Sequence, residues 1–289
     1  MSDRARLAVI GAGTMGSGIA QVALSAGHAV TLHDTDEAAA HRGRGRIADG
    51  LARAAAKGRL DGRDPSELLA ALTVASGDVG PSLAGADVVI EAIVEDAEVK
   101  AAAWRALGTA AGPHALLASN TSSLSITALA RASGRPERFV GLHFFNPVPR
   151  LALVEVVRPD GGPDGPVDEA VRFAEGLGKT PVTCADRPGF LVNRLLVPYL
   201  NEAATLYDEG AATPQAIDDA MRLGAAMPIG PLALCDLIGV DVVLAIMETL
   251  HDEFGDPRYR PAQVLRRLVR AGRLGRKSGA GFHDYGGEP

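Results

Sequence analysis

Short apolar runs alternate with longer segments of helical periodicity through the first part of the chain. The runs are rich in branched residues and cover 7–10, 28–34, 87–93, 115–120 and 138–144. Such runs are typical of parallel strands buried on both faces, and the helical segments between them would cover those faces. The pattern therefore predicts an amino-terminal, Rossmann-type, doubly wound α/β sheet.

The last part of the chain is helical in pattern. After a corner at 187–189, apolar residues recur at helical spacing, namely Leu191, Leu195, Leu196, Tyr199 and Leu200. Thr213 followed by proline predicts another helix start, and the nearly all-apolar stretch 231–251 predicts one long helix, either buried or at a subunit interface. We expect an NAD-binding Rossmann domain over 1–186 and an all-α carboxy-terminal domain over 187–289.

The composition narrows the classes of function. The 289 residues are 47% hydrophobic and 22% charged, enough for a sizeable core, and the net charge of −6 argues against a nucleic-acid partner. No apolar run is long enough for a membrane span and the first residues lack a signal-peptide pattern, so we expect a cytoplasmic protein with no membrane partner. Cys184 and Cys235 lack metal-ligand spacing, which predicts no metal site.

A glycine-rich turn joins the first expected strand to the first expected helix. Gly11, Gly13 and Gly16 have the G-x-G-x-x-G spacing, with Thr14 and Met15 before the last glycine. In this context the glycines permit a tight turn, approach of backbone amides to a pyrophosphate, and close packing of helix on strand. The turn therefore predicts dinucleotide binding, against the alternative of a ligand-free strand–helix–strand unit.

Asp34 ends the second expected strand, where a carboxylate can accept hydrogen bonds from ribose hydroxyls. It would repel a 2′-phosphate by roughly 1 kcal/mol in water and about 4 kcal/mol at an effective dielectric near 20. Asp34 therefore favours NAD over NADP, although Arg42 and Arg44 are close enough in sequence to weaken that preference.

Polar residues also fall where the later strands end: Glu91, Glu95, Asn120, Ser122 and His143. Ligands of doubly wound sheets bind at the carboxyl ends of strands, so these residues predict the position of a site. His143 and Glu155 both stand in apolar runs. Because a buried unpaired carboxylate is costly, either both are solvated or they contact each other across a turn at the proline-rich segment 146–150.

Basic residues gather in the next helical segment: Arg42, Arg44, Arg46, Arg53 and Lys57. Charge alone favours a solvated helix face. The alternative is a basic rim for a phosphate-bearing ligand.

Eight motifs, in this order, resemble the L-3-hydroxyacyl-CoA dehydrogenase family, most closely the short bacterial 3-hydroxybutyryl-CoA dehydrogenases: VIGAGTMGSGIAQ, EAIVED, SNTSSLSIT, GLHFFNPVP, VEVV, PGFLVNRLL, GPLALCDLIGVD and GRKSGAGF. The resemblance spans residues 7–285. It implies an oxidoreductase that uses NAD to interconvert a short-chain 3-hydroxyacyl thioester and its 3-keto form. It also implies a homodimer formed through the helical domain, and fatty-acid breakdown is one of several pathways that would use such a site.

The resemblance assigns roles at the matching positions. His143 corresponds to the catalytic base, Glu155 to its carboxylate partner, and Ser122 and Asn193 to the residues that orient substrate. The cofactor contacts correspond to Gly11, Gly13, Thr14, Met15, Gly16, Asp34, Glu95, Lys100, Asn120, Ser122 and Asn146, and the CoA end of the substrate to Arg53 and Lys57. From the residues alone, Ser119, Ser123 or Ser125 could replace Ser122, Lys100 could be a solvated helix residue, and Asn193 could be structural.

The chain departs from the family pattern at Gly50, Ala226, Met227, Ala280 and His283. The thiol carrier therefore stays open between CoA and an acyl-carrier protein. Two further alternatives are a dehydrogenase of a free hydroxy acid and a non-catalytic NAD-binding protein.

Overall fold

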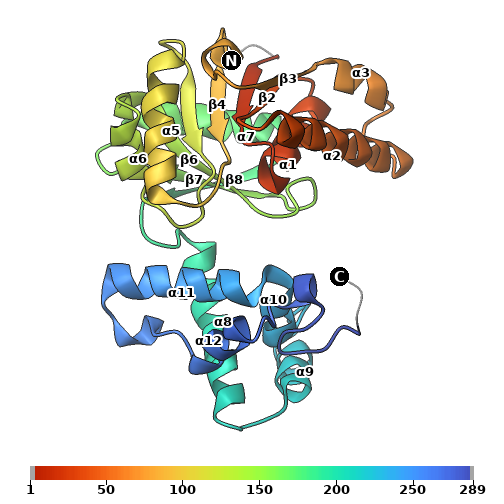
Figure 1. Cartoon of the computed structure of the whole chain (residues 1–289), viewed down its shortest axis with the longest axis vertical. Coiled ribbons are helices and arrows are strands. Elements are labelled where there is room, and N and C mark those ends of the chain that lie inside the picture. The colour runs from red at the N-terminus through yellow and green to blue at the C-terminus, as the bar shows by residue number, and fades with distance from the viewer. Residues whose placement is uncertain (1–3, 287–289) are drawn as a thin grey trace. The chain divides into compact units, whose positions relative to one another are not determined.

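The structure is a computed structural model that describes residues 4–286. The chain divides into two compact units, with the division between Arg187 and Pro188 (Figure 1). Each unit has a hydrophobic core of its own. No helix within residues 4–286 combines the length and apolar character needed to cross a bilayer.

The first unit is built on an eight-stranded sheet in the order β3-β2-β1-β4-β5-β6-β7-β8. Neighbouring strands pair parallel except β6 and β7, which pair antiparallel. The strands are β1 (Arg6–Ile10), β2 (Ala29–Asp34), β3 (Leu72–Ser76), β4 (Val88–Glu91), β5 (Leu116–Ser119), β6 (Phe139–Phe144), β7 (Leu153–Arg158) and β8 (Thr180–Ala185). The strand order reverses between β1 and β4, which is where doubly wound sheets bind their ligands.

Helices cover both faces of this sheet, which is why β4, β5 and β6 are buried throughout. α1 and α7 contribute to the core on one face, while on the other α5 packs on β6 through an edge-to-face contact of Trp104 and Phe139 with ring centroids 4.6 Å apart. The helices are α1 (Thr14–Ser25), α2 (Glu37–Ala56), α3 (Pro65–Ala70), α4 (Gly80–Leu83), α5 (Ala97–Ala110), α6 (Ile126–Ala132) and α7 (Asp164–Gly176), with a 3-10 turn at Pro136–Arg138. The predicted doubly wound sheet is confirmed.

The second unit is helical. It contains α8 (Val192–Asp208), α9 (Pro214–Gly224), α10 (Pro231–Ile238), α11 (Val240–Phe254) and α12 (Gln263–Arg270), with 3-10 turns at Pro257–Tyr259 and Arg276–Ser278. The prediction of one long helix over 231–251 is wrong. Gly239 has φ of 111°, outside the helical region, and it separates α10 from α11.

Candidate active site

His143 and Glu155 lie directly opposite each other on β6 and β7. His143 Nδ1 is 2.6 Å from Glu155 Oε2, and the two side chains are 7% and 1% exposed. Of the two alternatives for these residues, the structure has the one in which they contact each other. Because the carboxylate faces Nδ1, a proton held there makes Nε2 the ring nitrogen with an acceptor lone pair.

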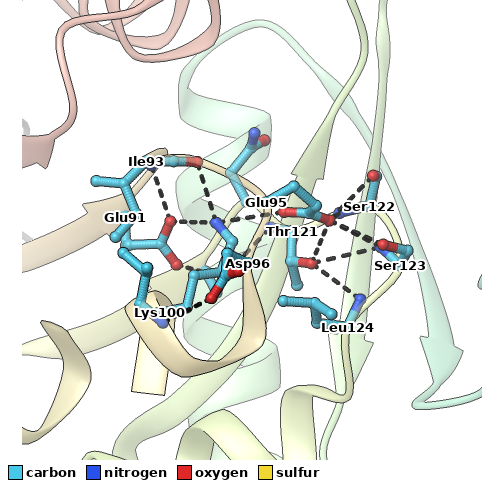
Figure 2. Close-up of polar contacts among 12 residues, drawn as sticks. Glu91, Ile93, Glu95, Asp96, Lys100, Thr121, Ser122, Ser123 and Leu124 are labelled. Atoms are coloured by element: carbon cyan, nitrogen blue, oxygen red, sulfur yellow. Dashed lines mark hydrogen bonds and ion pairs between the residues drawn. The ribbon is translucent and has the colours of Figure 1, made fainter. Parts of the chain in front are cut away.

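A buried ion pair lies at the carboxyl end of β4 (Figure 2). Lys100 of α5 is 1% exposed; its ammonium donates to Glu91 and lies 3.4 Å from the carboxylate of Glu95. Glu91 also accepts hydrogen bonds from Trp104 at 3.2 Å and Ser119 at 2.7 Å. The solvated alternative for Lys100 is therefore wrong, and its contact with a cofactor stays a prediction.

Glu95 organises the loop that follows β5, as Figure 2 shows. Its Oε1 accepts hydrogen bonds from the Thr121 hydroxyl at 2.6 Å, the Ser122 amide at 2.8 Å and the Ser123 amide at 3.2 Å. The hydroxyls of Ser122 and Ser123 each donate to the same oxygen at 3.1 Å. Burial raises the pKa of Glu95, but the Lys100 ammonium and these hydrogen bonds outweigh it and hold the pKa below its ordinary value. The loop is thus wrapped around an ionised carboxylate.

The neighbouring serines have structural partners. Ser119 donates to Glu91 inside the sheet, and Ser125 caps α6 while donating to Asp186. These contacts leave Ser122 and Ser123, both beside Glu95, as the serines at the carboxyl edge of the sheet. Thr121 accompanies them and was not among the predicted site residues. The signal that could have found it is an acidic residue shortly after one strand together with hydroxyl residues shortly after the next strand.

Asn120 and Asn146 occupy different surroundings. Asn120 is 9% exposed and accepts a hydrogen bond from the Phe144 amide at 2.9 Å, so it joins the end of β5 to the end of β6. Asn146 is exposed on the segment after β6. Asn193 lies in the first turn of α8, in the second unit.

The glycine turn has the packing expected of a dinucleotide loop. A Cβ at Gly11 would lie 2.5 Å from the Ala92 carbonyl oxygen, and one at Gly16 would lie 1.8 Å from the Gly11 carbonyl oxygen. A Cβ at Gly13 would meet nothing within 4 Å. The first and third glycines are therefore required for close packing, and the second leaves open space at the start of α1.

Asp34 supports this turn from the end of β2. One carboxylate oxygen accepts a hydrogen bond from the Ala12 amide at 2.8 Å, and the other accepts from the Asp36 amide at 3.1 Å. The sequence predicts a ribose contact for Asp34. The structure adds that this carboxylate also fixes the glycine turn.

A groove of about 910 Å³ on the first unit is lined by α1, α2 and the segment after β6. It brings together Thr14, Asn146 and three cations of the basic run, Arg46, Arg53 and Lys57. Arg42, by contrast, pairs with the exposed carboxylate of Asp36. The cations of the run are exposed, as a solvated helix face would have them, and three of them also line the groove, so their role as a basic rim for a phosphate-bearing ligand stays a prediction.

Comparison with known proteins identifies the chain. Residues 6–187 match the profile described as 3-hydroxyacyl-CoA dehydrogenase, NAD binding domain, and residues 189–285 match the carboxy-terminal domain of the same family. The chain belongs to the 3-hydroxyacyl-CoA dehydrogenase family.

Relatives of this family resemble the chain over nearly its whole length. A probable 3-hydroxybutyryl-CoA dehydrogenase from Deinococcus radiodurans is 49% identical over 280 residues, which cover 97% of this chain and 100% of that protein. The mitochondrial hydroxyacyl-coenzyme A dehydrogenase of Sus scrofa is 42% identical and covers 96% of this chain and 90% of that protein. The crystal structure of (S)-3-hydroxybutyryl-CoA dehydrogenase from Ralstonia eutropha superposes with a TM-score of 0.93 at 43% identity, covering 98% and 99% of the two chains.

As a 3-hydroxyacyl-CoA dehydrogenase, the chain is an NAD-dependent oxidoreductase. Its own residues fit that cofactor, because the open space at Gly13 adjoins the amides at the start of α1 and a carboxylate stands at the end of β2. Gly11, Gly13, Gly16 and Asp34 would hold the dinucleotide.

Proposed function

We propose that this 3-hydroxyacyl-CoA dehydrogenase interconverts a short-chain 3-hydroxyacyl-CoA, such as 3-hydroxybutyryl-CoA, and the corresponding 3-ketoacyl-CoA, with His143 as the catalytic base. The buried contact of His143 Nδ1 and Glu155 Oε2 carries the proposal. The names of the relatives support a short acyl chain.

The pair provides the proton chemistry that alcohol oxidation needs. NAD, when bound, accepts hydride from the hydroxyl-bearing carbon of the substrate. His143 Nε2 takes the hydroxyl proton, because a proton held on Nδ1 by Glu155 leaves Nε2 with the acceptor lone pair of the ring. The resulting imidazolium lies against Glu155, which stabilises its charge and keeps the proton on Nδ1. In the reverse direction the imidazolium returns that proton to the 3-keto oxygen.

Ser122 and Asn193 would orient the substrate oxygens in this scheme. The hold of Glu95 on the Ser122 amide and hydroxyl supports a fixed position for that serine. Arg53 and Lys57, on the groove of the first unit, would receive the phosphates of the thiol carrier.

The direct test follows NADH consumption by the purified protein with acetoacetyl-CoA and, separately, free acetoacetate. We expect turnover with the thioester and little with the free acid. His143→Ala should lower kcat by about 100- to 10,000-fold, because a positioned general base contributes that range. Its Kd for NADH should change by less than about threefold, since Asp34 and the glycine turn are untouched.

His114→Ala is the matched control, because His114 is exposed before β5, away from the carboxyl edge of the sheet. It should retain full activity. Turnover only with a thioester of an acyl-carrier protein would show that this carrier, and not CoA, holds the substrate. Preferred turnover of free acetoacetate would make the chain a hydroxy-acid dehydrogenase, and tight NADH binding without any turnover would make it a binding protein.

We also infer a homodimer formed through the helical unit. Leu206, Leu223 and Leu237 are 42%, 81% and 52% exposed there, which is more apolar surface than a solvated helix face favours. Light scattering at micromolar concentration should give twice the chain mass. Introducing glutamate at Leu223 should shift the protein toward the monomer if this surface forms the contact.

A further inference from the structure

Helix α2 packs directly on the glycine turn. A Cβ at Gly43 would lie 2.8 Å from the Ala12 Cβ and 3.0 Å from the Ala12 carbonyl oxygen, so only glycine lets the helix approach this closely. Arg46 lies three residues further along α2, on the same side of the helix. The approach of α2 at Gly43 therefore brings Arg46 within reach of the turn.

Arg46 holds a specific carbonyl of that turn. Its guanidinium donates to the Ala12 carbonyl oxygen, and its Nε donates to the Ser17 hydroxyl at 3.3 Å. Ser17 donates to the same Ala12 oxygen at 3.0 Å. On the other side of the residue, the Ala12 amide donates to Asp34 at 2.8 Å. Ala12 is thus held through its amide by β2 and through its carbonyl by α2.

The orientation of one peptide plane follows from these contacts. The Ala12 carbonyl and the Gly13 amide belong to the same planar trans peptide group, so they point in opposite directions. Gly13 precedes α1, and its missing side chain leaves open space at the helix amino terminus, where a pyrophosphate binds in this kind of fold. A guanidinium that fixes the Ala12 carbonyl therefore also fixes the direction of the Gly13 amide.

We propose that Arg46 is a positioning residue for the NAD pyrophosphate: from α2 it locks the Ala12–Gly13 peptide so that the loop amides are set before the cofactor arrives. This inference rests on the NAD-dependent function of the chain. The same guanidinium lines the groove that also holds Arg53 and Lys57, so a competing role exists as a phosphate ligand of the acyl-CoA. Removal of the Arg46 guanidinium should weaken binding of NADH if it is a positioning residue, and binding of acyl-CoA if it is a phosphate ligand.

The test measures the Kd of NADH by fluorescence titration without substrate. Arg46→Ala should raise this Kd by between about 10-fold and 150-fold, the range expected for losing a charged hydrogen bond. Arg46→Lys should recover part of the affinity, because one ammonium can still donate to the carbonyl. Arg44→Ala is the matched control: it removes an exposed guanidinium of the same helix that does not line the groove, and it should leave the Kd within about twofold.

Two further measurements distinguish the positioning role of Arg46 from a long-range effect of its charge and from a role in substrate binding. The loss in Arg46→Ala should persist in 1 M NaCl, where the screening length is only about 3 Å, whereas a long-range charge effect would disappear. The KM for acetoacetyl-CoA at saturating NADH should change by less than about threefold. If Arg46→Ala does not fold, Arg46→Met, which keeps an unbranched side chain but has no donor, replaces it in the same comparison.

The proposal is overturned if the Kd of NADH is unchanged in Arg46→Ala, if the loss vanishes at high salt, or if only the KM for acetoacetyl-CoA rises. A wild-type protein that binds NADH but does not reduce acetoacetyl-CoA would contradict the proposed substrate and leave this test intact, because the titration needs no turnover.

Discussion

At the scale of single residues, the site depends on charged side chains that are buried and paired. Lys100 and Glu91 are 1% and 0% exposed, and each has the other as its nearest opposite charge. Removing one member of such a pair leaves an uncompensated buried charge, which costs about 3–5 kcal/mol in typical cases. We expect substitutions at either position to act through folding before they act through cofactor binding.

Asp34 carries a prediction about cofactor choice. Asp34→Asn should increase the ratio of NADPH to NADH turnover by at least about fivefold, because the amide removes the charge that repels a 2′-phosphate. Asp34→Ala should in addition weaken NADH binding, since it also loses the acceptor of the Ala12 amide. The measurement is kcat/KM for both cofactors at constant acetoacetyl-CoA. An unchanged ratio in both variants would remove Asp34 from cofactor selection.

At this scale the sequence predicted side-chain types better than contacts. The cost of an unpaired buried carboxylate left the pairing of His143 and Glu155 as one of two alternatives, and the structure decided between them. The solvated alternative for Lys100 was wrong because Lys100 pairs with the buried Glu91. Glu91 is buried because β4 lies between β1 and β5, and this strand order could not be read from the sequence. Arg46 was one cation among several until the packing of α2 was known.

At the scale of elements, the loop after β5 takes its shape from a carboxylate at the start of α5 rather than from its own sequence. The pKa of Glu95 is lowered in the folded protein, so its contribution to stability is complete above the unfolded value of about 4.3 and is lost as the pH falls through the folded pKa. The loop that carries Ser122 is therefore acid-sensitive.

Glu95→Gln tests this dependence. At pH 7 the variant should have a Tm about 1–4 °C below that of the wild type, a modest effect because the side chain is 37% exposed. The difference should shrink as the pH falls below the unfolded value of about 4.3 and through the lowered folded pKa, where the wild-type carboxylate becomes protonated. Glu98→Gln, at an exposed position in the first turn of α5, should show a smaller difference at neutral and at acidic pH. A gap that widens on acidification would contradict the assignment.

Ala226 marks the element boundary after α9 and has φ of 54°. A non-glycine residue in the left-handed region of φ costs roughly 1–2 kcal/mol of folding free energy. Glycine removes this cost but has a larger conformational entropy in the unfolded chain, which offsets part of the gain. Ala226→Gly should therefore stabilise the protein by up to about 1 kcal/mol, and Ala226→Asn by less. Thermal unfolding measures the effect. Ala225→Gly is the control: its φ of −114° needs no glycine, so this substitution should destabilise the chain. A lower Tm in Ala226→Gly would contradict the prediction and show that the backbone strain at Ala226 is relieved in another way.

Elements were predicted where periodicity alone decides them. Strands β1, β2, β4, β5 and β6 follow from apolar runs, because a parallel sheet covered on both faces leaves few alternatives. Strands β3, β7 and β8 were not predicted, and β3 and β8 are the edge strands of the sheet. The break between α10 and α11 was missed, since Gly239 lies in a continuous apolar stretch and its φ depends on local packing that the pattern does not express.

At the scale of the whole molecule, the two units have separate cores. Leu7, Ile90 and Leu142 belong to the first core, and Leu200 and Met247 belong to the second. The glycine turn, the His143–Glu155 pair and the groove all belong to the first unit, whereas Asn193 belongs to the second. Binding of the cofactor and completion of the reaction are therefore expected to be separable.

A fragment of residues 1–187 tests this separation. We expect it to fold, with a far-ultraviolet circular dichroism spectrum of a mixed α/β protein, and to bind NADH with a Kd within about threefold of the full chain. Its turnover of acetoacetyl-CoA should be at least about 100-fold lower, because the fragment lacks Asn193, which we propose to orient the substrate. Asn193→Ala in the full chain should reproduce part of that loss. Failure of the soluble fragment to bind NADH would make the second unit part of the cofactor site.

The antiparallel register of β6 and β7 has a consequence for redesign of this protein. His143 and Glu155 are matched by the hydrogen-bonding ladder of their strands, and the length of the connection at 145–152 helps to set that register. Substitutions at exposed positions of that connection, such as Pro149 and Arg150, would reshape the groove while the proton-transfer pair keeps its alignment, whereas Val148 is 2% exposed and belongs to the core. A one-residue insertion within either strand would have the opposite outcome, because it turns every following side chain to the other side of the sheet.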